Sequence, residues 1–424
     1  MKLESNSAPI SLAEAQQKVL SVCESRGLEP EWVDLEHAQG RILAADVCAP
    51  RNLPPFDNSA MDGFALASAD LPTAGDRRLR IAGSRFAGDS EPVRIGHGEC
   101  LRITTGAPLP DGADTVIIKE RVRVDGDDAV FTVGESAGSN VRRAGEDFAI
   151  GDIVMRRGQR ITSTRIGGLA TLGQGSLKVI RQPRVSVITT GNELVMPGDE
   201  HGPASIYNSN GFSLVALLRA SGIEAQKSED GHDGPRFHHL PDDPETIRHV
   251  LRELAASTDV IITSGGVSAG EADWLPSLVN ELGCIHFWKV RMRPGMPFLF
   301  GEIGSCLIFC LPGNPVSTIA TFLCLVQPAL RALQGVEQPM PELPHAHLAS
   351  AISKRHDRAE FLRACCEVRS DGTLWVGSLT RQGSAMQRGI IEANALICVP
   401  EAARTLEAGT LVRIMRLPEL DWTP

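Results

Sequence analysis

A loop with residues suited to phosphate or metal chemistry occupies residues 259–274, which read DVIITSGGVSAGEADW. An apolar run stops at two glycines, and Ser268, Glu271 and Asp273 follow. Two chemistries fit this order. The glycines would let a phosphate approach the backbone while the carboxylates hold Mg²⁺. Alternatively, the GxSxG spacing around Ser268 is that of the nucleophile elbow of serine hydrolases.

Further polar residues follow the neighbouring apolar runs. Glu193 follows RVSVITTG after one intervening residue, Asp242 precedes a predicted helix, and a basic segment that begins at Lys289 follows HFW. The turn LPGNPVST leaves the last apolar run. In an open parallel sheet the carboxyl ends of the strands meet at one edge, where ligands bind. We therefore expect these groups to converge on one site, although each alone could be a helix cap, a turn or a solvated surface.

The serine-hydrolase alternative has weaker support. In the nucleophile elbow the strand runs almost directly into the first glycine, whereas Thr263, Ser264 and Gly265 intervene here. No HGGG-like loop lies upstream, and the downstream histidines have no motif around them. A Walker A motif and a complete GxGxxG are also absent, so common ATPase and dinucleotide folds lose support.

The elements that position these residues change along the chain. Residues 11–25 predict a helix with Ser11 as N-cap, and residues 40–180 show short β runs between Gly, Pro and Asp clusters. From Pro183 strands and helices alternate, including IEAQ as a short strand, which predicts a three-layer α/β domain with a mainly parallel sheet. Short β runs return over 341–416 and predict a C-terminal β-barrel-like domain.

The predicted organisation is therefore a multidomain α/β plus β protein, in which small β-rich domains flank the α/β domain. Four domains are expected: a discontinuous first domain of residues 1–50 and 148–180, an inserted β-rich domain at 51–147, the α/β domain at 181–335, and the C-terminal domain at 336–424.

Composition narrows the function classes. The formal net charge is −10, which argues against a protein that coats nucleic acid, because phosphate binding needs a positive field over a sizeable face. The sequence shows neither a signal peptide nor an apolar run of membrane-spanning length, so we expect a cytoplasmic protein with no membrane contact. The ten cysteines form no CxxC pair, and GHDGPRFHH lacks recognisable zinc spacing and is interpreted as a polar loop.

Taken together, the motifs resemble one known family. PPFDNSAMDGFAL, RITTGAPLPDGADTVI, VRRAGEDF, TTGNEL, SGGVSAGEAD, FWKVRMRPGMPF and LPGNPVST occur in this order over nearly the whole chain. They resemble the molybdopterin molybdenumtransferase (MoeA) family, which is similar to the E domain of gephyrin. The resemblance implies a MogA-like α/β domain and an L-shaped homodimer whose active site lies between the α/β domain of one subunit and the second domain of the other.

The resemblance also implies a reaction and its residues. Adenylylated molybdopterin and molybdate are the substrates, Mg²⁺ is the cofactor, and AMP is released as molybdenum enters the dithiolene. Glu193, Asp242 and Asp273 match the acidic, metal-holding set. The other matched catalytic and substrate-binding positions are Asp62, Thr105, Asp147, Gly265, Gly266, Ser268, Lys289, Arg293, Pro312, Gly313, Pro315 and Ser384.

Departures from the family pattern and the expected partners complete the interpretation. The family often has KPGKP where this chain reads RPGMP, so Arg293 keeps a charge but Met296 loses one, which leaves the choice between molybdate and tungstate open.

No adenylylating domain is fused, so a separate molybdopterin adenylyltransferase is an expected transient partner. A non-catalytic scaffold is the alternative from another function class, since gephyrin's E domain also clusters receptors.

Overall fold

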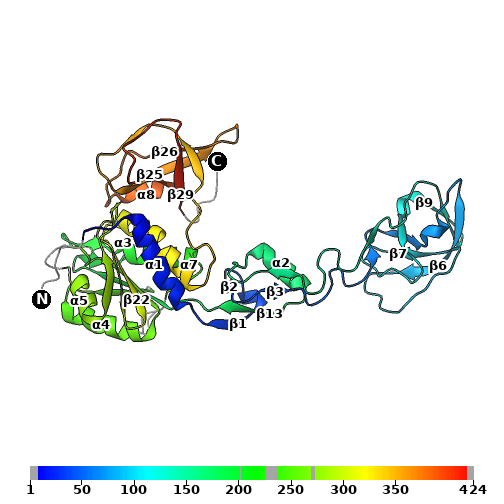
Figure 1. Ribbon diagram of the computed structural model, residues 1–424, viewed down its shortest axis with the longest axis horizontal. Coiled ribbons are helices and arrows are strands. Elements are labelled where there is room, and N and C mark those ends of the chain that lie inside the picture. Colours follow the sequence, from blue (N-terminus) through cyan, green and yellow to red (C-terminus); the bar gives the residue numbers. More distant parts are fainter. Residues whose placement is uncertain (1–7, 201, 226–235, 269–272, 418–424) are drawn as a thin grey trace.

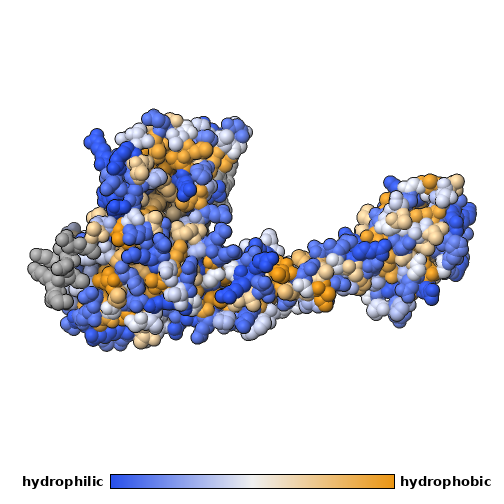
Figure 2. Space-filling view, viewed as in Figure 1, coloured by the Kyte–Doolittle hydropathy of each residue, from blue (hydrophilic) through white to orange (hydrophobic). Residues whose placement is uncertain are grey.

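A computed structural model describes residues 8–200, 202–225, 236–268 and 273–417. Figure 1 shows an elongated molecule with an α/β domain and a C-terminal β domain stacked at one end, a slender linking body in the middle and a separate distal lobe at the other end. The surface narrows along the linking body, so the distal lobe stands clear of the rest (Figure 2).

The α/β domain is built on a six-stranded sheet with the order β17-β14-β18-β22-β21-β19. The first four strands are parallel, whereas β21 is antiparallel to both of its neighbours. Strand β19 therefore runs in the same direction as β22 and ends at the same edge. The strands are β14 (Val185–Thr190), β17 (His238–Leu240), β18 (Val260–Ser264), β19 (Cys284–Trp288), β21 (Leu299–Ile303) and β22 (Cys306–Leu311).

Helices cover both faces of this sheet. Strand β18 shows why, since Ile262 packs into one apolar cluster and its neighbour Ile261 into the other, as the two-residue period of a strand requires. The predicted three-layer architecture is confirmed. The helices are α1 (Leu12–Arg26), α3 (Ser209–Ala220), α4 (Pro244–Ser257), α5 (Leu275–Leu282), α6 (Pro315–Thr321), the π-helical turn η4 (Phe322–Val326) and α7 (Gln327–Leu333).

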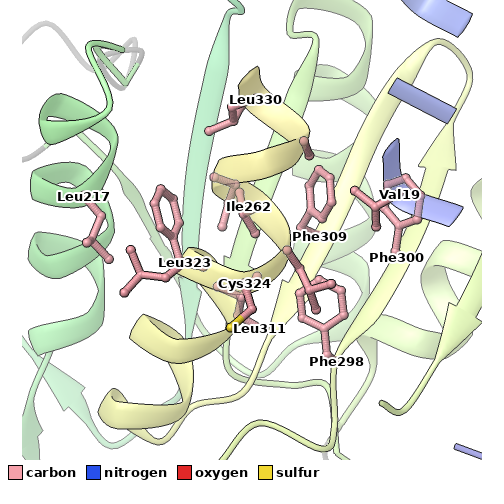
Figure 3. Close-up of a cluster of buried hydrophobic side chains, with 14 of the residues drawn as sticks. Val19, Leu217, Ile262, Phe298, Phe300, Phe309, Leu311, Leu323, Cys324 and Leu330 are labelled. Carbon is pink, nitrogen blue, oxygen red and sulfur yellow. The ribbon is translucent and has the colours of Figure 1, made fainter. Parts of the chain in front are cut away.

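The larger apolar cluster lies beneath α1, α3 and the continuous α6–η4–α7 segment (Figure 3). Phe300 stacks on Phe309 with ring centroids 4.8 Å apart, and Cys324 is fully buried among them. Burial raises the pKa of the Cys324 thiol well above its ordinary value. In the part of the chain that the structure describes, Pro315–Leu333 is the one helix long and apolar enough to cross a membrane, but 89% of its apolar window is buried inside the protein.

Local signals explain where the helices begin. The Ser11 hydroxyl accepts a hydrogen bond from the Glu14 N–H, the Asn208 side chain caps α3 through the Gly211 N–H, and Asp243 caps α4 through the Thr246 N–H. The predicted N-cap Ser11 is confirmed.

Two predictions for the α/β domain concern short segments beside β14. Within the described part of IEAQ only Ala225 pairs, in an isolated bridge to Val185, and Gln226 lies outside the described residues. His238 and His239 lie in strand β17 rather than in a polar loop, because the neighbouring Leu240 and Phe237 are buried and draw the segment onto the sheet. His232 lies outside the described residues.

The linking body carries the three-stranded sheet β1-β13-β2, beside which helix α2 and the pair β12-β3 lie. An ion pair attaches it to the α/β domain, since Arg181 donates two hydrogen bonds to Asp259, at 2.7 and 2.9 Å. The elements are β1 (Pro30–Asp34), β2 (Ile42–Leu43), β3 (Val47–Cys48), β12 (Ile153–Met155), α2 (Ser163–Thr171) and β13 (Ser176–Ile180).

The distal lobe is a second six-stranded sheet, with the order β8-β5-β7-β6-β10-β9, and the pair β11-β4 stands beside it. Its apolar clusters are small and are formed by its own strands. The strands are β4 (Asn58–Ser59), β5 (Gly63–Leu66), β6 (Arg77–Arg85), β7 (Glu99–Ile103), β8 (Thr115–Ile118), β9 (Val122–Asp125), β10 (Asp128–Phe131) and β11 (Val141–Arg142).

The C-terminal domain is a closed five-stranded barrel, because β25 pairs with β27 as well as with β26 and so completes the circle β25-β26-β23-β29-β27. The predicted barrel-like fold is confirmed. Its elements are β23 (His345–Leu348), β24 (Ile352–Ser353), β25 (Ala359–Val368), β26 (Leu374–Ser378), α8 (Gln387–Glu392), β27 (Ala395–Val399), β28 (Thr405–Leu406) and β29 (Leu411–Arg416), and β20 (Met292–Arg293) of the α/β domain pairs with β25.

Candidate functional site

A cavity of about 650 Å³ lies at the carboxyl edge of the parallel strands, and we call it the edge pocket. The loops that follow β14, β17, β18 and β22 all open into it, as expected for ligand sites of open α/β sheets. Of the residues predicted from sequence, the edge pocket is lined by Glu193, Asp242, Gly265, Gly266, Ser268, Asp273, Pro312, Gly313 and Pro315.

The floor of the edge pocket is backbone, and glycine makes it possible. Gly265 and Gly266 have φ angles of 100° and 63°, which favour glycine. A Cβ on Gly265 would stand 2.7 Å from the Thr190 carbonyl oxygen, and one on Gly313 would stand 3.6 Å from the Gly265 Cα. Two neighbouring turns therefore approach each other closely and leave peptide groups facing the pocket.

Polar side chains tie the turns together. Asn210 donates hydrogen bonds to the Ser264 hydroxyl at 2.9 Å and to the Gly313 carbonyl at 2.7 Å, so α3 holds the ends of β18 and β22 in register. The Thr190 Oγ1 and the Asn210 Oδ1 are buried and have no hydrogen-bond partner among the described residues. Unmatched polar atoms are uncommon in a protein interior, and here they stand beside a cavity.

The three carboxylates of the edge pocket come from three different loops. The Glu193 carboxylate lies over Gly191, with both oxygens 2.8 Å from where a Cβ on that glycine would stand. Asp242 accepts the Asn192 N–H at 3.1 Å, and Asn192 Oδ1 accepts the Asp242 N–H at the same distance. Asp273, which lies between β18 and α5, also lines the pocket. Within the described parts of the chain, no three His, Cys, Asp or Glu side chains are close enough to hold a metal by themselves.

The roof of the edge pocket comes from the C-terminal barrel. The Ser384 carbonyl accepts the Val316 N–H at 3.2 Å, and Gln387 donates to the Ser209 hydroxyl at 3.1 Å. Arg363, which is 1% exposed, holds this loop by donating to the carbonyls of Arg381, Gly383 and Met386. Sequence motifs pointed to Ser384 but not to Arg363, whose only signal was a charge inside the apolar run FLRACC.

The basic segment lies beside the edge pocket rather than on its wall. Lys289 places its ammonium 4.6 Å from the ring centroid of Trp288, and that indole donates to the carbonyl of the pocket residue Val267. Lys289 has a φ of 74° and directly follows the last residue of β19, Trp288. Arg293 is exposed and faces the buried Glu360 at 3.5 Å.

A cation from the barrel stands near Met296, the position at which the family pattern has lysine. The Arg358 guanidinium donates toward the Met296 sulfur at 3.9 Å. The two residues are 62 positions apart in the chain. Nothing in the sequence alone brought them together, so Arg358 was missed.

The remaining sequence-predicted residues lie far from the edge pocket within one chain. In the distal lobe, Asp62 accepts hydrogen bonds from the Thr105 N–H at 2.9 Å and the Thr105 hydroxyl at 3.0 Å, and Lys119 lies 3.5 Å away. The Thr105 N–H, followed by its hydroxyl and Lys119, holds the pKa of Asp62 below its ordinary value. Asp147 is exposed near the linking body, and its N–H donates to Leu53.

Among the described residues, Ser268 has none of the surroundings of a serine nucleophile. It is exposed, and no histidine is among the described residues that line the edge pocket. A hydrolytic serine needs a general base within hydrogen-bond reach. The described geometry therefore favours the cradle over the nucleophile elbow, while Glu271 of the same loop lies outside the described residues.

Comparisons with known proteins converge on one family. Residues 10–173 match the model for the MoeA N-terminal region (domain I and II), residues 186–332 that for a probable molybdopterin binding domain, and residues 345–417 that for the MoeA C-terminal region (domain IV). The chain is 35% identical to the molybdopterin molybdenumtransferase of Haemophilus influenzae over 389 residues, which covers 91% of this chain and 93% of that protein.

Two further relatives extend the likeness. Gephyrin of Dictyostelium discoideum is 31% identical over 450 residues, which covers 96% of this chain and 62% of that protein. A crystal structure of the molybdopterin biosynthesis MoeA protein from Pyrococcus horikoshii is 25% identical, covers 97% of this chain and all of that one, and superposes with a TM-score of 0.82.

Proposed function

The chain belongs to the MoeA family, and from that premise we propose that it is a molybdopterin molybdenumtransferase that uses adenylylated molybdopterin and molybdate, inserts molybdenum into the dithiolene and releases AMP. The observation that carries the proposal is the convergence of Glu193, Asp242 and Asp273 on one glycine-floored cavity. Cleaving a phosphoanhydride requires groups that neutralise phosphate charge and orient the attacking oxygen, and such a cavity supplies them.

Mg²⁺ suits the donors of the edge pocket. Carboxylate oxygens are the ligands that Mg²⁺ prefers, and it usually takes only one or two from the protein and the rest from phosphates and water. That habit agrees with three carboxylates that share a cavity but do not form a ready-made metal cluster. Glu193, Asp242 and Asp273 would hold the ion, which when bound would neutralise negative charge on the phosphates.

The protein's own groups would then orient the substrate. The backbone around Gly265, Gly266 and Gly313 leaves space for phosphate oxygens, and Ser268 belongs to the same loop. The barrel loop that contains Ser384 contributes Ala385 and Gln387 to the lining of the pocket, where they could contact a bound substrate. Lys289 and Arg358 would provide positive charge beside the pocket for an oxyanion such as molybdate, with Arg358 offsetting the charge that Met296 lacks. The charge of Arg293 is offset by Glu360, which it faces at 3.5 Å, so Arg293 would contribute less.

The catalytic site is proposed to form between two copies of the chain. Asp62, Thr105 and Asp147 stand in or next to the distal lobe, which is far from the edge pocket of the same chain (Figure 1). A homodimer in which each distal lobe reaches the partner's edge pocket would bring both sets together. A separate adenylyltransferase is the proposed supplier of the substrate.

The decisive experiment measures AMP release by the purified protein from adenylylated molybdopterin and Mg²⁺, with and without molybdate. We expect release that depends on molybdate, with tungstate as the competing oxyanion. No release by folded dimer would contradict the enzymatic proposal, and binding of partner peptides without pterin affinity would then favour a scaffold.

A further inference from the structure

A second and larger cavity, of about 920 Å³, lies away from the edge pocket, between α7, the connection that follows it and the end of β29. We call it the junction cavity. Its polar wall includes Arg331, Gln327 and Gln338, and its apolar wall includes Leu323, Leu343 and Met415. None of these residues belongs to the proposed catalytic machinery.

Arg331 is the unusual feature of the junction cavity. It is half-buried at the end of α7, and its guanidinium donates to the Pro339 carbonyl at 3.4 Å. It forms no ion pair with any of the residues that the structure describes. Glu342 also lines the cavity but is exposed and does not pair with it. A cation taken out of water without a counter-charge is costly.

The positive charge of a second guanidinium, that of Arg160, makes the burial of charged Arg331 more costly still. Arg160 of the linking body places Nη2 3.2 Å from where a Cβ on Gly222 would stand, and the adjacent Ser221 accepts a hydrogen bond from Gln327 of α7 at 3.1 Å. Burial, followed by the nearby charge of Arg160, lowers the pKa of Arg331. Arg160 does not itself line the cavity, but Arg416 lines it together with Arg331, and two like charges on the wall of a cavity favour the entry of an anion.

The walls indicate what kind of anion fits. A guanidinium pairs with two oxygens of a phosphate at once. Gln327 and Gln338 offer amide donors and acceptors, while the leucine and methionine side chains offer an apolar wall against which a ring can pack. The volume is that of sites for small organic ligands rather than for inorganic ions.

We propose that the junction cavity is a second ligand site, which binds a phosphate monoester of a flat heterocycle through Arg331. It lies where α7, the connection that follows α7 and the barrel meet, so its ligand would contact both the α/β domain and the barrel. The site is independent of the proposed molybdenum insertion.

The test is photolabelling of the full-length protein with 8-azidoadenosine 5′-monophosphate, followed by mass spectrometry of the labelled peptides. We expect label on peptides that contain Leu323–Leu343, protected by excess AMP and not by adenosine. Label on peptides from the edge pocket is read separately, so the result does not depend on the catalytic proposal. Absence of label from the junction cavity would overturn the inference.

Variants identify the group responsible. R331Q should reduce labelling of the junction cavity by about 10- to 100-fold, because a charge-assisted hydrogen bond is lost, whereas R331K should retain much of it. R157Q changes an exposed arginine of the linking body and serves as the matched control. Equal labelling of R331Q and the wild type would overturn the role of Arg331.

The chain's own C-terminus offers the competing explanation. Residues 418–424 follow Leu417, which lines the cavity, and they carry Glu419 and Asp421. A variant that ends at Leu417 should be labelled as strongly as the full chain. Labelling only after truncation would show that the tail fills the cavity, and the ligand-site proposal would be wrong.

Discussion

The edge pocket and the turn around Asp62 are built in different ways. The edge pocket collects side chains from four strand ends, an α-helix and a barrel loop, all resting on the largest apolar core. The Asp62 turn is local, since one carboxylate is held by Thr105 and Lys119 within a small sheet. Changes in the first region therefore propagate through packed elements, whereas changes in the second stay confined.

The comparison has a functional counterpart. A region supported by a deep core can hold a bound substrate in fixed geometry. A local turn on an extended lobe can be brought to a neighbouring molecule without disturbing its own core. We therefore expect binding to depend on the edge pocket and turnover to depend on both regions.

The largest expected effect comes from Asp242. D242N removes a carboxylate that lines the edge pocket and should lower the rate of AMP release by about 10²- to 10³-fold, a loss typical of groups that stabilise transition-state charge. The adjacent Asp243 is a matched control, because it caps α4 instead of lining the pocket. D243N should lower Tm slightly and keep most of the activity. Equal activity losses in both variants would show that the edge pocket is not the reaction site.

The dimer proposal gives the next effect. D62N should abolish turnover as strongly as D242N but leave substrate affinity unchanged when measured by titration calorimetry. Mixing the two inactive variants and exchanging subunits should restore about a quarter of the wild-type activity, since half of the dimers are mixed and each mixed dimer has one intact site. No recovery in a mixture proven to contain mixed dimers would mean that Asp62 acts within its own chain.

Glycine substitutions test the difference in packing. G265A meets the Thr190 carbonyl at 2.7 Å in addition to an unfavourable φ, and should cost about 2 to 4 kcal/mol of unfolding free energy. G88A in the distal lobe has a similar φ of 98° and nothing within 4 Å, so it should cost roughly 1 kcal/mol. Urea unfolding followed by a probe in each region measures both. Similar costs would remove the contrast between a packed and an open turn.

Acid stability should depend on Asp259 at the junction with the linking body. Burial alone would raise its pKa, but hydrogen bonds from Arg181 and Arg184 outweigh that effect and bring the pKa to about 2. Because the folded pKa is depressed, the ion pair stabilises the fold above pH 4 and this contribution is lost as the pH falls toward 2. D259N should cost about 2 kcal/mol at neutral pH and flatten the stability curve in that window.

Asp62 of the distal lobe provides the comparison for Asp259. Asp62 also has a lowered pKa, but it is exposed. Its substitution should leave the acid unfolding curve nearly unchanged. A D62N curve as flat as that of D259N would show that the distal turn is a structural support and not a local feature.

Much of the fold followed from residue patterns because those patterns record local physics. The N-caps at Ser11, Asn208 and Asp243 and the buried run at 260–264 each specify an element within a few residues. The rule for parallel strands then predicted that Glu193 and Asp242 would meet at one edge, and they line the same cavity.

Other features could not be foreseen, because they depend on contacts between distant segments. The seating of the Ser384 loop on Val316 and the approach of Arg358 to Met296 depend on how the barrel docks on the α/β domain. Arg293 was expected to face an oxyanion, and in the structure it faces Glu360 of the barrel. The pairing of β17 was also missed, since two histidines concealed a short strand.

The π-helical turn η4 lets the two halves of the long buried helix present their side chains in independent directions. Each residue of an ordinary α-helix advances the side chains by about 100° around the axis, so a fixed spacing fixes every direction along it. At Phe322–Val326 the helix has a wider turn, in which the Gln327 N–H donates to the Phe322 carbonyl. This turn changes the direction in which the following side chains point. The half that begins at Pro315 can thus follow the pocket while the half that contains Leu330 follows α1. Deleting one residue there would restore a regular helix and turn one half out of alignment with its surroundings.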